Sequence, residues 1–474
     1  MKVSNINQTS TKRPRWKRAV ALATALHILS YTMLPSVGMV AAEQVAQKEV
    51  KASTNSATSS AKSTEAAKNM GASLKTKLDL KVTSAIIVEA STGQVYAEYE
   101  ADKALPPASM TKMMTEYIVM EKIKAGELSW DTVVTTTEHA SLTGGSRIFL
   151  AKGDQHTVEE LYIAMAIGSA NDATVALAEH ISQSEKQFVK LMNETAKRLG
   201  MEDTHFINST GLGKKDMPEK YQPASNEETV MSARDVAKLV RAIVIDHPEF
   251  SKYTTIQQHK FRERDATPII NLNWMLEANK DVTNFRQFAY EGLDGMKTGF
   301  TDQAKYTFAG TAERDGMRLI TVVMGSPRKE TRFTETKKLL DYGFKHIELK
   351  QVIGPKQVVA GTETAPIKSG VETEVPIVTE KEVAFVVDKG AKFDAKNLKQ
   401  EVKLTPEDQL EAPIKQGQKI GTVTYTYKGT AGEEQQTVNL IASEEVEKGS
   451  WWRLFFRGIK NFFVDLFNSI GSLF

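Results

Sequence analysis

Hydrophobic and polar residues alternate with a period of two in the C-terminal part of the chain, after about Glu348. Such alternation is typical of strands that bury one face, and Gly, Pro and Lys turns separate the segments. The alternating segments are Gln357–Ala360, Val371–Val375, Glu382–Val387, Lys419–Tyr427 and Gln436–Ile441. They predict a small all-β domain, a sandwich, over residues 349–447, and we assign no chemistry to it.

Residues 75–348 instead combine short strand-like runs with longer segments of helical composition. The predicted strands are a hairpin around Ser91-Thr92-Gly93 within residues 81–99 and, much later, Leu293–Gly299, Thr307–Ala312 and Arg318–Met324. The predicted helices are Met110–Lys124, Val158–Ser182 with a break at Gly168-Ser169, Phe188–Leu199, Ser232–Ile245 and Glu330–Tyr342. Helices placed between the N-terminal and C-terminal strands of one sheet predict an α+β or α/β domain with an antiparallel sheet.

The N-terminus has the pattern of an export signal. The basic stretch Lys12–Arg18 precedes the mostly apolar segment Ala19–Val40, and small residues follow it. We therefore expect residues 1–42 to be a signal peptide that is cleaved before Glu43. An uncleaved membrane helix is the alternative, although polar residues and a proline interrupt the apolar segment.

Residues 43–74 are rich in Ala, Ser, Thr, Lys and Gln and contain almost nothing to bury, which predicts a disordered linker.

The last segment, residues 450–474, predicts an amphipathic helix. Large apolar residues recur at steps of three and four, at Trp452, Phe455, Phe456, Ile459, Phe463, Leu466, Phe467 and Ile470. Polar residues gather on the opposite face, at Arg453, Arg457, Lys460, Asn461, Asp465 and Asn468. No uninterrupted apolar run is long enough to cross a bilayer, so the pattern favours a helix that lies in the membrane interface. A helix packed on the protein's own core is the alternative.

Charge and cysteine content exclude several classes of protein. Lys and Arg number 61 and Asp and Glu 59 in 474 residues, so there is no basic excess to suggest nucleic-acid binding. The chain has no cysteine, which excludes disulfides, thiolate metal sites and a cysteine nucleophile. There is also no Gly-x-Ser-x-Gly or His-Glu-x-x-His motif. We predict neither a metal nor a cofactor.

The candidate chemistry lies in three short motifs in a fixed order: Ser109-Met-Thr-Lys112, Ser169-Ala-Asn171 and Lys297-Thr298-Gly299. Each motif alone is common, and chance copies occur at Ser59/Lys62, Ser326/Lys329 and Ser53/Asn55. The three motifs together are informative about function, because they lie in one globular stretch and each has a sequence context that its chemistry needs.

A serine hydroxyl needs a base within hydrogen-bond reach before it can act as a nucleophile. Ser109 follows a double proline at a helix start, and positions i and i+3 share a helix face, so Lys112 lies beside it. Lys112 must be neutral to accept a proton, which requires burial or a nearby cation, and Lys297 is the natural cation. Without the other motifs, Ser109 and Lys112 would be an ordinary helix start, and Ser169 and Asn171 a helix cap.

In these motifs the chain resembles the low-molecular-mass penicillin-binding proteins that are D-alanyl-D-alanine carboxypeptidases, from about Lys75 to the C-terminus. The resemblance implies a β-lactamase-like catalytic domain. It implies that Ser169 relays a proton to the leaving amine, that the Asn171 amide holds the substrate backbone, and that the backbone N–H groups of Ser109 and Phe300 form the oxyanion hole.

The resemblance also assigns substrate contacts near the third motif. Lys297, Thr298 and Gly299 would bind substrate, because Gly299 leaves room for a peptide to pair with the strand edge. Arg332 resembles the family arginine that grips the terminal carboxylate, although Arg328 is close by. Some relatives have histidine at the position of Phe300, so we expect an altered rate or pH response with retained activity.

The expected function is therefore removal of the terminal D-Ala from peptidoglycan stem peptides ending in D-Ala-D-Ala, through a Ser109 acyl-enzyme that penicillins would also form. A β-lactamase, a D,D-transpeptidase and a non-enzymatic wall-binding protein remain as alternatives. No Glu-x-x-Leu-Asn segment is present to position a deacylating water, which disfavours the β-lactamase. We expect an exported protein held at the outer face of the cytoplasmic membrane by its C-terminal helix.

Overall fold

The computed structural model describes residues 74–429 and 432–471. The predicted signal peptide, and the predicted linker except for Leu74, lie outside this part of the chain. Leu74 itself is buried and begins a helical turn over residues 74–78.

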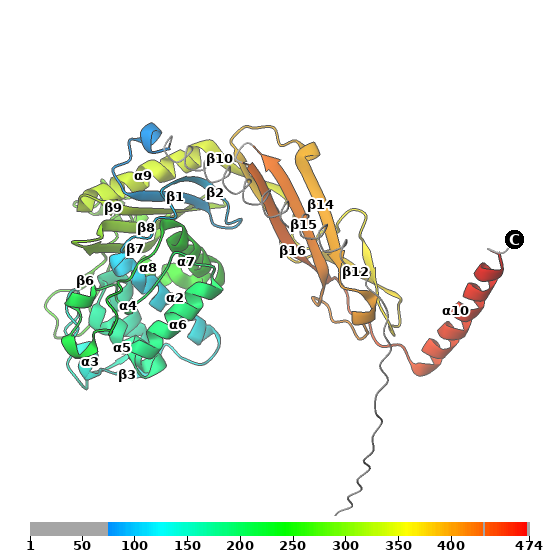
Figure 1. Cartoon of the computed structure of the whole chain (residues 1–474), viewed down its shortest axis with the longest axis horizontal. Helices are drawn as coiled ribbons and strands as arrows, with labels where there is room; N and C mark the ends of the chain where they lie inside the picture. Colours follow the sequence, from blue (N-terminus) through cyan, green and yellow to red (C-terminus); the bar gives the residue numbers. More distant parts are fainter. Residues whose placement is uncertain (1–73, 430–431, 472–474) are drawn as a thin grey trace, which may run out of the picture. The chain divides into compact units, whose positions relative to one another are not determined.

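An antiparallel sheet with strand order β2-β1-β9-β8-β7 organises residues 84–326 (Figure 1). Its strands are β1 (Ser84–Glu89), β2 (Val95–Tyr99), β7 (Leu293–Thr301), β8 (Lys305–Arg314) and β9 (Met317–Ser326). The predicted hairpin is β1 and β2, and β1 pairs in turn with β9, with Ala85 opposite Val323. N-terminal and C-terminal strands therefore share one sheet, as the sequence predicted. Within the described residues β7 pairs with another strand, β8, on one side only.

Helices cover both faces of this sheet. Helix α9 (Lys329–His346) packs on β8 and β9 from one side, and α7 (Ala233–Asp246) packs on β1 and β9 from the other (Figure 1). Further helices between β2 and β7 stand on the α7 side and build a large apolar core with it. They are α2 (Lys112–Lys124), α4 (Val158–Gly168), α5 (Asn171–Ser182) and α6 (Glu185–Arg198), with the short α3 (Glu138–Leu142) and α8 (Ser251–Thr254). Small hairpins complete this part: β3 (Val133–Thr135) with β4 (Gln155–Thr157), and β5 (Gln258–His259) with β6 (Ile269–Ile270).

Helix α2 is the most enclosed of these elements at its N-terminal end. Every residue from Lys112 to Met120 is buried, because the helix contacts α4, α5, α6 and α7. Its sequence therefore shows no solvent face over these residues, and the polar groups it carries are removed from water.

The predicted helix Val158–Ser182 is interrupted where the sequence indicated. The Thr157 hydroxyl accepts from the Glu160 backbone N–H and the Glu160 carboxylate accepts in return, which starts α4 with a capping box. Ser169 ends α4 in the left-handed conformation, with φ of 58°, and α5 begins at Asn171. A non-glycine residue in this conformation is uncommon and often marks a functional position.

The C-terminal part forms an all-β domain with its own apolar core. A sheet of order β11-β12-β16-β15-β14 faces the pair β10–β13, which is consistent with the predicted sandwich. The strands are β10 (Ile347–Ile353), β11 (Thr364–Pro366), β12 (Glu374–Thr379), β13 (Val383–Asp388), β14 (Leu398–Leu404), β15 (Lys419–Gly429) and β16 (Gly432–Ala442).

Two strand predictions in this domain need correction. Gln357–Ala360 is not a strand: Val359 forms only an isolated bridge with Thr362, and the Gln357 side chain accepts from the Gly354 backbone N–H. The strand predicted from Val371 begins instead at Glu374. The turn residues around these segments outweighed the short alternation.

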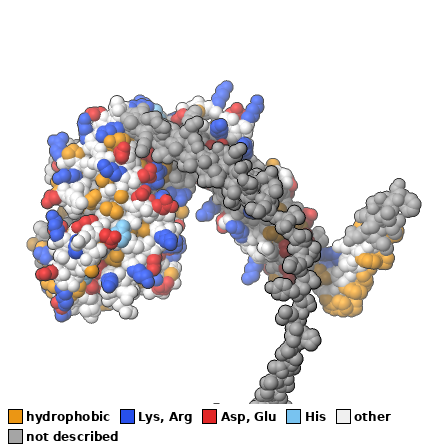
Figure 2. Space-filling view, in the orientation of Figure 1, with side chains coloured by type: hydrophobic (Ala, Val, Ile, Leu, Met, Phe, Trp, Pro, Cys, Tyr) orange, Lys and Arg blue, Asp and Glu red, His pale blue; other side chains and the backbone are white. Residues whose placement is uncertain are grey.

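Helix α10 (Trp451–Gly471) follows the β domain. Its aromatic side chains at positions 451, 452, 455, 456, 462, 463 and 467 are each between 50% and 69% exposed. Figure 2 shows hydrophobic side chains gathered along this helix. The side chains of Asp465, Leu466, Asn468 and Ile470, which the sequence placed on its two faces, lie outside the described residues. Within residues 74–429 and 432–471, no helix has both the length and the hydrophobicity that a bilayer crossing requires.

Candidate active site

Ser109 and Lys112 lie at the junction of a 3₁₀ turn, Ala108–Thr111, and α2. The Lys112 Nζ contacts the Ser109 Oγ at 3.1 Å and donates to the Thr210 carbonyl at 2.7 Å. The Lys112 side chain is fully buried, so the structure brings the predicted nucleophile and base together in a place that water does not reach freely.

The environment of Lys112 favours its neutral form. Burial holds the pKa of Lys112 well below its usual range, and the positive charge of Lys297 lowers the pKa further. The carboxylates of Glu116, Glu185 and Asp172 act in the opposite direction. Desolvation is therefore the larger cause, and the second lysine reinforces it.

A tight turn holds the Thr210 carbonyl against Lys112. The Asn208 side-chain oxygen accepts from Thr210 N–H and Oγ1 and from the Gly211 N–H, at 2.7 to 3.1 Å. Gly211 has φ of 80°, and a Cβ there would collide with the Ala108 carbonyl oxygen. Only glycine fits where the turn approaches the Ser109 segment so closely.

Ser169 and Asn171 sit at the break between α4 and α5. The Ser169 Oγ is buried and has no hydrogen-bond partner among the described residues, whereas most buried hydroxyl groups have one. The Asn171 amide donates to the Gly144 carbonyl at 2.7 Å, and its backbone N–H donates to the Ser146 carbonyl at 2.7 Å. Asn171 therefore fixes the loop at residues 144–146 beside the motif.

Lys297, Thr298 and Gly299 lie on β7, and all three are buried. A Cβ on Gly299 would lie 2.6 Å from the Pro107 carbonyl oxygen and would also collide with the Thr307 hydroxyl. The absence of a side chain thus lets β7 approach the segment that carries Ser109. Burial lowers the pKa of Lys297 to about 8, with Arg332 lowering it and the Glu116 carboxylate raising it.

Phe300 and Arg332 flank the end of this motif. The Phe300 ring is 48% exposed and stacks on Tyr306, with ring centroids 4.4 Å apart. Arg332 on α9 is buried and donates from Nη1 to the Gly299 carbonyl at 3.1 Å. Its Nε has no hydrogen-bond partner in the described part of the chain, and burial lowers the pKa of its guanidinium to about 10. It keeps its charge near neutral pH and has donor capacity for an anion.

Sequence reasoning missed two participants in this arrangement. The Thr210 carbonyl binds Lys112, and the only signal for it was an Asn-Ser-Thr-Gly run typical of a turn. Glu116 lies one helical turn after Lys112 and is 1% exposed. Its i+4 spacing from Lys112 was visible in the sequence, but its burial was not.

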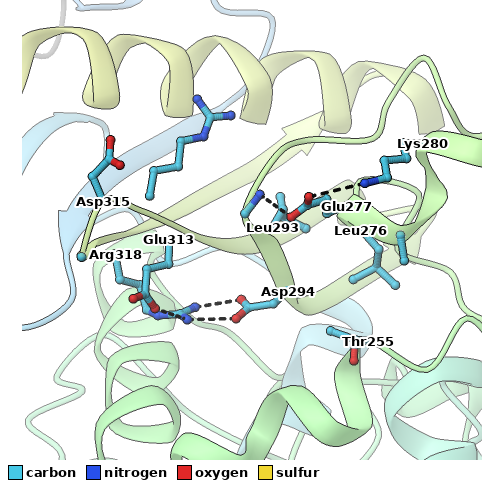
Figure 3. A pocket seen from close by; sticks show the side chains of 13 residues that line it. Thr255, Leu276, Glu277, Lys280, Leu293, Asp294, Glu313, Asp315 and Arg318 are labelled. Atoms are coloured by element: carbon cyan, nitrogen blue, oxygen red, sulfur yellow. Dashed lines mark hydrogen bonds and ion pairs between the residues drawn. The ribbon is translucent and has the colours of Figure 1, made fainter.

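A cavity of about 620 Å³ lies elsewhere, and Figure 3 shows its lining. None of the predicted site residues lines it. The charged side chain of Arg318 in its lining already binds Asp294 at 2.8 Å and Glu313 at 2.6 Å. A smaller pocket of about 110 Å³ adjoins the site, between Ala108, Gly211 and Thr301. The chemistry is therefore better located by the three motifs than by the size of a cavity.

Comparison with known proteins decides the family. A model described as D-alanyl-D-alanine carboxypeptidase matches residues 68–328, and one for the C-terminal domain of penicillin-binding protein 5 matches residues 348–448. The chain belongs to the D-alanyl-D-alanine carboxypeptidase family. It is 33% identical to the carboxypeptidase DacF of Bacillus subtilis, over 78% of this chain and 86% of the relative. It is 34% identical to DacC of Escherichia coli, over 77% and 84% of the two chains.

Solved structures agree with this family. The chain is similar to a peptidoglycan synthesis regulatory factor, PBP3, from Streptococcus pneumoniae, with a TM-score of 0.64 and 29% identity over 78% of this chain and all of that chain. Penicillin-binding protein 5 from Haemophilus influenzae gives a TM-score of 0.59 and 29% identity, over 78% and 98%. The recognition of a serine D-Ala-D-Ala carboxypeptidase and the predicted fold class are confirmed.

Proposed function

We propose that Ser109 is the nucleophile of this carboxypeptidase and Lys112 its base. The supporting observation is the 3.1 Å contact between Lys112 Nζ and Ser109 Oγ, made by a lysine that is fully buried. Lys112 takes the hydroxyl proton as the Ser109 oxygen attacks the carbonyl carbon of the penultimate D-Ala. The backbone N–H groups of Ser109 and Phe300 stabilise the oxygen that becomes negative.

The attack forms a tetrahedral intermediate, and its collapse releases the terminal D-Ala. Ser169 relays the proton that Lys112 took from Ser109 to the leaving amine, the C–N bond breaks, and an ester of Ser109 with the shortened peptide remains. Water then hydrolyses the ester and returns the free enzyme. The hydroxyl of Ser169 at the end of α4, which has no hydrogen-bond partner in the described part of the chain, supports this relay.

The stem peptide lies along the open edge of β7 in this proposal. Its backbone pairs with the strand next to Gly299, and the Asn171 amide holds it from the other side. Lys297 and Thr298 bind it from β7, and Arg332 binds the terminal carboxylate. The Nε of the buried Arg332 has no hydrogen-bond partner within residues 74–429 and 432–471, which supports the last assignment.

β-Lactams are proposed to acylate the same serine, because the chain resembles penicillin-binding proteins along most of its described length. Trimming of purified muropeptides, followed by mass spectrometry, tests the peptidase function directly. Loss of one D-Ala per stem peptide is the expected result. A product joined to a second stem peptide would instead indicate transpeptidation, and an unchanged muropeptide would contradict both.

The C-terminal helix is proposed to hold an exported enzyme on the outer face of the cytoplasmic membrane, with the β domain as a spacer. The exposed aromatic residues of α10 support this role, since burying each contributes roughly 1.5–3 kcal/mol at best.

Truncation before Trp451 should therefore release the enzyme from membranes without changing its turnover on short peptides. Co-sedimentation of the full-length and truncated proteins with anionic lipid vesicles measures this. A full-length variant with Phe455, Phe456 and Phe463 changed to Ser is the matched control, and it should behave like the truncation. Equal partitioning of all three proteins would show that the helix is not the anchor.

A further inference from the structure

Glu185 is a buried carboxylate that holds the turn whose carbonyl contacts Lys112. It is the first residue of α6 and is 6% exposed. Its Oε1 accepts from the backbone N–H of Ser209 at 2.9 Å and from the Ser209 hydroxyl at 2.5 Å. Hydrogen bonds to a carboxylate are shorter and stronger than those between neutral groups. The position of Ser209 is therefore tied to the start of α6.

The turn lies between α6 and α2. The Lys112 Nζ donates to the Thr210 carbonyl at 2.7 Å, and the Thr115 hydroxyl, three residues further along α2, donates to the Ser209 carbonyl at 3.3 Å. Ser209 thus contacts α6 through its N–H and hydroxyl and α2 through its carbonyl. A shift of Ser209 would move the adjacent Thr210 carbonyl, and with it the Nζ that reaches Ser109.

The hydrogen bonds within the turn have a different task. The Asn208 side chain accepts from Thr210 and Gly211, so it fixes the shape of the turn. These bonds join residues that are neighbours in the sequence and do not attach the turn to a helix. Glu185 lies 24 residues before Ser209, and its hydrogen bonds do make that attachment.

A histidine packs against the other oxygen of Glu185. Oε2 lies 3.6 Å from the His139 Nε2, and the His139 Nδ1 lies 2.9 Å from the Glu179 carboxylate. Tyr221 stacks on the His139 ring, with centroids 3.8 Å apart. A glutamate in the first turn of a helix can be explained by the helix dipole alone, but such residues are rarely buried unless they are paired. The burial of Glu185 and its two bonds to Ser209 indicate a further task.

We propose that Glu185 is a positioning residue that holds the Thr210 carbonyl where it fixes the Lys112 Nζ against the Ser109 Oγ. This inference rests on the role proposed for Lys112. Proton transfer needs the base within hydrogen-bond reach of the hydroxyl, and a misplacement of about 1 Å can cost roughly 100-fold in rate. Because Glu185 acts through the turn, it affects the acylation step and not the binding that precedes it.

The charge of Glu185 has the opposite effect to its hydrogen bonds. Burial and the charge of Lys297 lower the pKa of Lys112, and the Glu185 carboxylate raises it. Removal of this charge alone would therefore favour the neutral form of Lys112 and would not slow acylation. A loss of rate on removing Glu185 would come from the lost hydrogen bonds.

The test measures binding and acylation separately. Stopped-flow mixing of the full-length protein with a chromogenic β-lactam, over a range of concentrations, gives the dissociation constant of the non-covalent complex and the acylation rate constant. Glu185→Ala should lower the rate constant by roughly 10- to 100-fold and leave the dissociation constant unchanged. Glu185→Gln keeps an oxygen that can accept from both donors of Ser209, so it should restore the rate constant to within a few-fold of the wild type.

A second variant keeps the test decisive if Glu185→Ala does not fold. Ser209→Ala removes the hydroxyl donor and retains the backbone N–H bond to Glu185. It should lower the same rate constant several-fold, again without a change in the dissociation constant.

Glu89 provides the matched control. It is also buried, and its carboxylate accepts from the N–H and hydroxyl groups of Ser91 and Thr92 in the turn between β1 and β2, at 2.7 to 3.1 Å. Glu89→Ala thus removes a carboxylate that holds a turn outside the site. It should lower the melting temperature and leave both acylation constants unchanged.

Three results would overturn the role of Glu185. They are a wild-type rate constant in folded Glu185→Ala or Ser209→Ala, an equal loss in Glu185→Gln and Glu185→Ala, and an equal loss in Glu89→Ala. A wild-type rate constant in Lys112→Arg would instead contradict Lys112 as the base, whatever the variants of Glu185 show.

Discussion

Ser109→Ala should abolish peptide cleavage and covalent labelling by a fluorescent penicillin while leaving the fold intact. Both reactions need an oxygen nucleophile at this position, and the methyl group of alanine cannot form an ester. Serine enzymes that lose their nucleophile typically lose about six orders of magnitude in turnover. The fold should persist because Ser109 is partly exposed and contributes one contact to the buried lysine.

Labelling followed by gel electrophoresis and intact-mass measurement provides the test, with thermal unfolding as the check on folding. Ser326→Ala is the matched control, since Ser326 begins the chance copy Ser326/Lys329 and is buried at the end of β9. It should label like the wild type. A covalent adduct on Ser109→Ala would mean that another serine is the nucleophile.

Lys112→Arg should be almost inactive even though it keeps a positive charge. A guanidinium has a pKa above about 12 and does not give up its proton, so it cannot accept one from Ser109. The neutral variant Lys112→Met should be impaired to a similar degree, and both losses should be on the order of 10²–10⁴-fold, as for other acid–base residues. The two variants differ in charge, but neither can accept a proton. Equal losses of activity would therefore show that proton transfer, rather than the positive charge, is what Lys112 supplies.

Acylation rates from stopped-flow mixing with a chromogenic β-lactam provide the comparison. Because burial and Lys297 depress the pKa of Lys112, the wild-type rate should rise as pH increases through that lowered pKa. Neither Lys112 variant should show this rise. Arginine at position 112 with a rate within a few-fold of the wild type would contradict the proposed base.

The sequence predicted those features that depend on local pattern. The strands β7, β8 and β9 and the break between α4 and α5 follow directly from apolar runs and from Gly168. Strand β14 was missed because Leu398 to Leu404 is largely lysine, glutamine and glutamate, and its pairing with β15 comes from tertiary structure. Strand β10 was missed because it follows α9 without an intervening turn.

The candidate site shows the same division. The residues of the three motifs could be named from type and spacing, and Lys112 could be placed beside Ser109 from helix geometry. Glu116 could not be recognised, because a glutamate between Thr115 and Tyr117 is indistinguishable from one on a solvated helix face. Its burial depends on α4, α5, α6 and α7 enclosing α2, which no local pattern records. The Thr210 contact likewise joins residues 98 positions apart.

Burying ionisable side chains also affects the folding stability of the domain. The buried side chains in the site include Lys112, Glu116, Lys297 and Arg332. Removing charges from water without complete pairing opposes folding, so the surrounding apolar core must compensate for this cluster. The side chains that the reaction needs therefore lower the folding stability of the domain. The Nε of the buried Arg332 has no hydrogen-bond partner among the described residues, so a ligand along β7 that accepts from it would offset part of this cost, and the acylated enzyme should resist unfolding better than the free enzyme.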